Sequence, residues 1–272
     1  MIYLISFFVL FGLAVVILMS RGLLVRVGRW VLHRRYDVSL SGVENLVPKR
    51  TYLVLPNHPA LVDPFILATE LYRFNVVIRP LIDESFFSSW LFKHIFMLFD
   101  AVRVPDFRHI NFRPILKIHP LRRDSVKRAR GLGETALSTL ASGGSVLLYP
   151  SGHITANGKE EMSNRQLAFN ILSKLPENVV VIGVRMRGLY GSMWSRVGGR
   201  PSPRFIRTFV KAIFMWFGTF FRSRRKVSIH FEEITDLARG WISKGRQAFN
   251  GHLEKWYDAD LAAANLLSEP AS

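Results

Sequence analysis

One short stretch, residues 52–68, restricts the fold more than any other part of the chain. The apolar run Tyr52-Leu-Val-Leu-Pro56 is typical of a buried strand. Asp63-Pro64 is typical of a helix start, with Asp as the N-cap and Pro at the first helical position. The loop between them carries His58. We therefore expect His58 and Asp63 at the carboxyl edge of a sheet, where open α/β sheets bind ligands.

The same two residues form a His-x4-Asp pattern that suits proton transfer. The His would take a proton from a hydroxyl, while the Asp would fix the ring and stabilise the imidazolium that forms. Chance often produces this spacing, and a lone loop histidine is commonly bonded to backbone instead. The pattern needs support from the rest of the chain.

Composition narrows the class of protein. The 272 residues are 49% hydrophobic, enough for a substantial core. There is no cysteine, so disulfides, Cys-ligated zinc and thiol catalysis are excluded. The eight histidines contain no His-x3-His pair, which disfavours a zinc enzyme. The net charge of +17 indicates a polyanionic partner: nucleic acid, anionic lipid or an acidic carrier protein.

The N-terminus favours lipid among these partners and argues against nucleic acid. Residues 1–19 are uncharged and apolar, and about 20 such residues span a bilayer as a helix. No Lys or Arg precedes the run and no small-residue cleavage site follows it, so we expect a membrane anchor rather than a signal peptide. A buried core helix is the alternative. Arginines follow in an amphipathic segment, residues 21–35, so the chain should face the cytoplasm at the inner (plasma) membrane.

The chain therefore divides into an anchor, residues 1–35, and one domain, residues 36–272. Apolar runs predict strands at residues 38–40, 51–55, 76–78, 102–104, 145–149, 179–184 and 227–231. Helical patterns cover residues 125–141, 164–174 and 242–267.

Three further segments suit a membrane surface. Residues 86–99 are mostly apolar and would lie on lipid, line an acyl-chain pocket or form plain core. Residues 103–130 carry nine Lys and Arg against two acids, which favours phosphate as a partner. Residues 205–221 fit an in-plane amphipathic helix better than a second span, because their charges fall inside the segment.

A second motif follows the strand predicted at residues 145–149. Tyr149-Pro150-Ser151-Gly152-His153 turns sharply at a sheet edge and exposes backbone N–H groups. Such groups bind an oxyanion or a phosphate oxygen. Taken alone, Pro-Ser-Gly is an ordinary turn.

Four ordered blocks resemble the glycerolipid acyltransferases, the lysophosphatidate acyltransferase-like superfamily. The blocks are Asn57-His58-x4-Asp63, Asp83-Glu-Ser-Phe-Phe with Ala101-Val-Arg103-Val, Tyr149-Pro-Ser-Gly152 and Val181-Ile-Gly-Val184. The resemblance covers about residues 38–235. Three further stretches look most like the acyltransferase domain of bacterial 2-acylglycerophosphoethanolamine acyltransferases: Gly152–Thr155, Gly188–Ser192 and Val227–Phe231.

The resemblance implies an α/β fold with a mixed central sheet flanked by helices, and acyl transfer from a thioester to a glycerolipid hydroxyl. His58 would be the general base and Asp63 would orient it. The donor would be acyl-carrier protein or acyl-CoA, the acceptor a lysophospholipid, and no metal or cofactor is required. The implied substrate-binding residues are Asn57, Arg103 (for the acceptor phosphate), Tyr149, Pro150, Ser151, Gly152 and His153.

The chain departs from the family pattern where the acceptor is bound. Ser151 replaces the usual Glu of the third block, His153 replaces an Arg, and Gly183 replaces the Pro of the fourth block. We therefore expect an acceptor other than plain lysophosphatidate, including a non-phosphoglycerol acceptor. The alternative from another class is a membrane lipid-binding homologue without turnover. A hydrolase is disfavoured because no Gly-x-Ser-x-Gly elbow is present.

Overall fold

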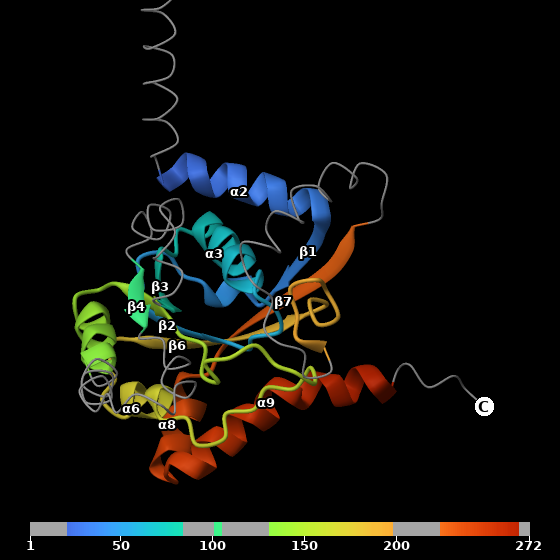
Figure 1. Cartoon of the computed structure of the whole chain (residues 1–272). Coiled ribbons are helices and arrows are strands. Elements are labelled where there is room, and N and C mark those ends of the chain that lie inside the picture. The colour runs from blue at the N-terminus through green and yellow to red at the C-terminus, as the bar shows by residue number, and fades with distance from the viewer. Residues whose placement is uncertain (1–20, 84–100, 105–130, 198–223, 267–272) are drawn as a thin grey trace, which may run out of the picture.

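A computed structural model describes residues 21–83, 101–104, 131–197 and 224–266. Their strands form one seven-stranded sheet in the order β1-β7-β6-β2-β5-β3-β4 (Figure 1). The strands are β1 (Tyr36–Ser41), β2 (Tyr52–Pro56), β3 (Ile78–Asp83), β4 (Val102–Val104), β5 (Ser145–Leu147), β6 (Val180–Arg187) and β7 (Arg225–Glu233). The five strands from β6 to β4 run parallel, and β7 is antiparallel to β6. The expected mixed central sheet is confirmed.

Helices cover both faces of this sheet (Figure 1). On one face lie α2 (Arg21–Arg35) and α3 (Asp63–Arg73), and on the other lie α6 (Leu167–Leu172), α8 (Thr235–Ser243) and α9 (Arg246–Leu266). Residues 131–141 are also helical, and a short 3-10 helix, η1 (Val43–Asn45), follows β1. The expectation of flanking helices is therefore confirmed.

The central strand β2 shows why its sequence is apolar throughout. Tyr52 and Val54 pack in the core beneath α3, while Leu53 and Leu55 pack in the core on the opposite face. All five residues of β2 are buried. A strand covered on both faces needs apolar side chains at every position rather than at alternate ones.

The strands β1 and β2 follow one another in sequence but are not neighbours, because β7 and β6 lie between them. The helix expected at residues 242–267 is confirmed as α9, which begins at Arg246, and residues 242–243 instead end α8. Gly245 separates the two helices with φ of 90°, a left-handed conformation that glycine adopts without steric cost.

Four predicted segments lie outside the described residues: the anchor at 1–19, the apolar stretch 86–99, the basic run from 105 onward and the amphipathic stretch 205–221. Among the residues that the structure does describe, no helix combines the length and apolar character needed to cross a bilayer.

A buried carboxylate, Glu70, fixes α2 against α3. It accepts hydrogen bonds from Arg29 at 3.0 Å, from His33 at 2.6 Å and from Arg73 at 3.0 Å. Burial opposes ionisation, but the hydrogen bonds from His33 and Arg73 and the charge of Arg29 outweigh it and lower the pKa of Glu70. Since α3 begins at Asp63, this cluster also helps to hold the start of that helix in place.

Gly183, which replaces the family's Pro, lies in β6 beneath Trp256 of α9. A Cβ at this position would lie 2.5 Å from Trp256 Cη2 and 3.0 Å from Ile234 Cδ1. The absence of a side chain therefore lets α9 pack directly on the strand.

Replacing Gly183 by Ala should destabilise the protein by about 1 to 3 kcal/mol, because the added methyl overpacks the core against Trp256. The control is Gly240→Ala, where a Cβ meets nothing within 4 Å and the helical position should gain about 0.5 to 1 kcal/mol. Urea unfolding measures both. Equal effects of the two substitutions would contradict this account of Gly183.

Candidate active site

Three parallel neighbours, β5, β2 and β6, bring the candidate residues to one edge of the sheet. Beyond β2, the Asn57 N–H donates to the Val184 carbonyl at 3.2 Å. The Asn57 side chain is buried and pairs with the backbone of Met186: Nδ2 donates to its carbonyl at 3.0 Å, and Oδ1 accepts from its N–H at 2.7 Å. Asn57, expected to bind substrate, thus ties the His58 loop to β6.

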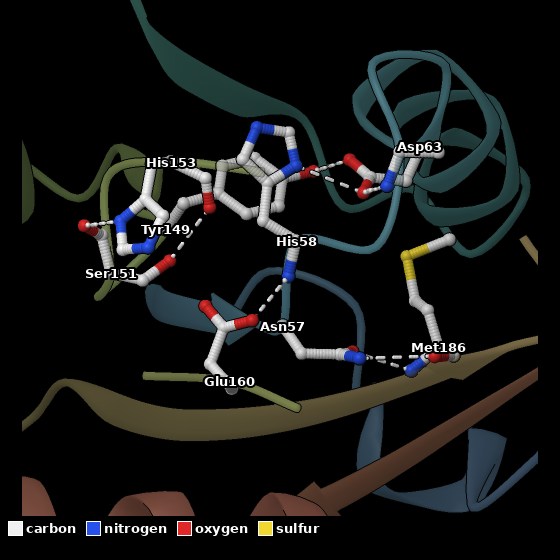
Figure 2. A network of polar contacts seen from close by, with 9 residues as sticks. Asn57, His58, Asp63, Tyr149, Ser151, His153, Glu160 and Met186 are labelled. Carbon is white, nitrogen blue, oxygen red and sulfur yellow. Dashed lines mark hydrogen bonds and ion pairs between the residues drawn. The ribbon is translucent and has the colours of Figure 1, made fainter. Parts of the chain in front are cut away.

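His58 and Asp63 meet as the sequence predicted (Figure 2). His58 Nδ1 lies 3.0 Å from Asp63 Oδ2, which also accepts the Ala60 N–H at 3.1 Å. The hydroxyl of Tyr149 donates to Asp63 Oδ1 at 2.7 Å, and its ring packs on the imidazole with centroids 4.2 Å apart. The Asp63 side chain is fully buried, whereas the His58 side chain is 14% exposed.

The expectation that Asp63 caps α3 through its side chain was wrong. Asp63 is the first residue of the helix, Val62 is at the N-cap, and no side chain caps the helix. Both carboxylate oxygens are already used by His58, Ala60 and Tyr149. Pro64 does lie in the first turn, as expected.

These contacts shift the pKa values of His58 and Tyr149. Burial lowers the pKa of His58, but the charge and hydrogen bond of Asp63 and the charge of Glu160 outweigh it and raise that pKa above 6.5. Burial and the charge of Asp63 raise the pKa of Tyr149 well above its usual 10. Tyr149 is therefore a neutral donor to Asp63, which the prediction of a substrate contact did not anticipate.

The backbone of His58 is also held from the segment that follows the second motif. Its N–H donates to Glu160 Oε2 at 2.9 Å, and its carbonyl accepts the Thr155 N–H at 3.0 Å. Glu160 is buried, and burial raises its pKa although the His58 N–H, the Ser151 hydroxyl and the His58 charge lower it. Glu160 was not selected in the sequence analysis. The feature that could have identified it is the presence of a carboxylate shortly after the third block.

The third block forms a tight turn beside this pair (Figure 2). The buried Ser151 hydroxyl donates to the His153 carbonyl at 3.1 Å, and His153 Nδ1 donates to the Ser151 carbonyl at 2.8 Å. Gly152 is exposed with φ of 64°, and its N–H donates to the Tyr149 carbonyl at 3.1 Å. That N–H, expected to steady a negative charge, is thus engaged within the turn. Pro150 is buried.

Arg103 lies farther along the sheet. Its backbone is in β4, the edge strand, paired in register with Ile82 of β3. The strands β5 and β3 separate β4 from β2, and the Arg103 side chain lies outside the described part of the chain. Within the described residues no three His, Asp or Glu side chains gather where a metal ion could bind.

The arrangement supports one kind of chemistry. Since Nδ1 donates to Asp63, the neutral ring carries its lone pair on Nε2, which points away from Asp63 (Figure 2). Among the described residues, none bonds Nε2. A partly exposed imidazole that is in this tautomer and is bonded to a buried carboxylate can accept a proton from an approaching hydroxyl.

Replacing Tyr149 by Phe should lower the free energy of unfolding by about 1 to 3 kcal/mol, because Asp63 Oδ1 loses its buried donor. The matched control is Tyr190→Phe, which removes a hydroxyl bonded to the Ala156 carbonyl at 2.9 Å and should cost about 1 kcal/mol or less. Denaturant unfolding compares the two. An equal or smaller loss at Tyr149 would contradict this role for its hydroxyl.

Comparison with known proteins identifies the family of the chain. The family model "Acyltransferase" matches residues 37–187, more than half of the chain, and this range includes His58 and Asp63. The crystal structure of the 1-acyl-sn-glycerophosphate (LPA) acyltransferase PlsC from Thermotoga maritima is similar in fold, with a TM-score of 0.53 and 15% identity over 91% of this chain and 78% of that chain. No curated protein matches the sequence. The chain therefore belongs to the acyltransferase family.

Proposed function

We propose that this protein transfers a fatty acyl group from a thioester, carried by acyl-carrier protein or CoA, to the hydroxyl of a lysophospholipid or related glycerolipid. The observation that supports it most is the partly exposed His58 ring bonded to the buried Asp63, in a chain of the acyltransferase family. The positive net charge of +17 suits both anionic donors.

The proposed reaction is a direct transfer. The acceptor hydroxyl gives its proton to His58 Nε2 as its oxygen attacks the thioester carbonyl. The new C–O bond forms and the C–S bond breaks, and the imidazolium returns the proton to the departing thiolate. Asp63 holds the ring in the required tautomer and stabilises its charged form. Arg103 is proposed to bind the acceptor phosphate, and Ser151 and His153 to shape acceptor choice.

We also propose that the domain works at the cytoplasmic face of an anionic membrane. The helix α2 exposes Val27, Trp30 and Val31 along one stripe and carries arginines around it. Exposed apolar residues with nearby cations are typical of helices at lipid interfaces. Co-sedimentation with vesicles of phosphatidylglycerol against vesicles of phosphatidylcholine tests this; equal binding to both would count against an anionic surface as the partner.

Substituting His58 by Ala should reduce acyl transfer at least about a hundredfold, because the general base is lost. The control is His252→Ala, whose ring stacks on Trp241 in the C-terminal helices and should leave transfer unchanged. Mass spectrometry of products from acyl-carrier-protein and CoA donors, with a panel of lysolipids, measures both. A wild-type protein that binds these lipids without product would instead be the non-catalytic homologue.

The rate should rise with pH through a value above 6.5, because His58 acts as a base only when neutral and its pKa is raised. In Asp63→Asn the charge that raises this pKa is gone while burial remains, so the acid limb of the pH profile should move to lower pH. The rate should also fall at every pH. An acid limb that stays in place would contradict the assignment of Asp63 as the partner.

A further inference from the structure

Glu160 is a buried carboxylate at the bottom of the site. The proposed reaction gives this residue no role. Glu160 is 4% exposed, its Oε2 accepts the His58 N–H at 2.9 Å, and its Oε1 is buried without a hydrogen bond from the described residues. Burying a carboxylate in this way is costly, and a chain that gained nothing from the charge would place an apolar residue there.

The position of Glu160 relates it to Ser151. The Ser151 hydroxyl donates to the His153 carbonyl, yet it lies close enough to Glu160 to lower the pKa of that carboxyl. Ser151 is the residue that stands where the third block usually has Glu. The carboxylate missing from the turn is thus present beside it, on a later residue of the same loop (Figure 2).

We propose that Glu160 supplies the carboxylate that Ser151 lacks and is a positioning residue: it holds the His58 backbone and places a second negative charge beside the ring. The proposal rests on the function proposed above. Asp63 bonds the imidazole and Glu160 bonds the peptide N–H of the same residue, so two buried acids flank one base. Both charges favour the imidazolium that forms when the acceptor hydroxyl loses its proton.

The other titratable groups around Glu160 do not neutralise it. Among the described residues, the charged or ionisable groups that face it are His58, Asp63, the neutral Tyr149 phenol and Tyr257 of α9. Burial and the charge of Glu160 raise the pKa of Tyr257 well above 10, so this phenol stays neutral. No cation among these residues except the His58 ring is positioned to compensate Glu160.

The first test measures the His58 pKa by NMR titration in Glu160→Gln. The amide keeps an oxygen for the His58 N–H but removes the charge, so the pKa should fall by about half a unit or more. The control is the adjacent exposed Glu161→Gln, whose carboxylate bonds Asn157 and which should leave the pKa unchanged. An unchanged His58 pKa in Glu160→Gln overturns the proposal. This readout needs no turnover, so it stands even if the wild type transfers no acyl group.

The second test moves the carboxylate. Ser151→Glu should lower acyl transfer about tenfold or more, because it forces two buried carboxylates into contact. Adding Glu160→Leu to it should restore about tenfold over the single variant, giving a coupling that independent sites do not show. Glu160→Leu alone completes the cycle, and circular dichroism confirms that each variant is folded. Additive losses in folded variants overturn the proposal.

Discussion

The buried carboxylate of Asp63 is the contact on which the rest of the site depends. It accepts from the His58 ring, the Ala60 N–H and the Tyr149 hydroxyl, and its side chain is fully buried. A carboxylate that is buried away from solvent is stable only when its oxygens accept hydrogen bonds and an opposite charge is near. The three donors therefore act together: they satisfy Asp63, and through it they fix the orientation of His58 and the conformation of its loop.

The sheet makes this convergence possible. The parallel strands β5, β2 and β6 are adjacent, so the segments that leave their carboxyl ends emerge side by side. The loop after β2 is bonded to β6 through Asn57 and to the segment after β5 through Thr155. The cluster around Glu70 then holds α3, and with it Asp63, against α2. His58 is thus held by a rigid framework although it lies in a loop.

Local patterns were sufficient to predict the strand before His58, the helix after it and the meeting of His58 with Asp63. They could not predict which groups Asp63 would accept from, since an Asp before Pro normally caps its helix and here a distant phenol competes for it. Tyr149 is 86 positions from Asp63 and Glu160 is 102 from His58, so no periodicity links them. The need for Gly183 likewise depends on Trp256, which another helix supplies.

The bond between Asn57 and Met186 has a further consequence for how the protein folds. It joins residues 129 positions apart, across two strands that run parallel and so require a long connection. Contacts of such high sequence separation close large loops and tend to form slowly. The loop that presents His58 is therefore expected to reach its final shape only after most of the sheet is assembled. A nascent or partly unfolded chain would then lack the oriented His58 ring on which the proposed transfer depends, so the proposed activity would arise only on the completed fold.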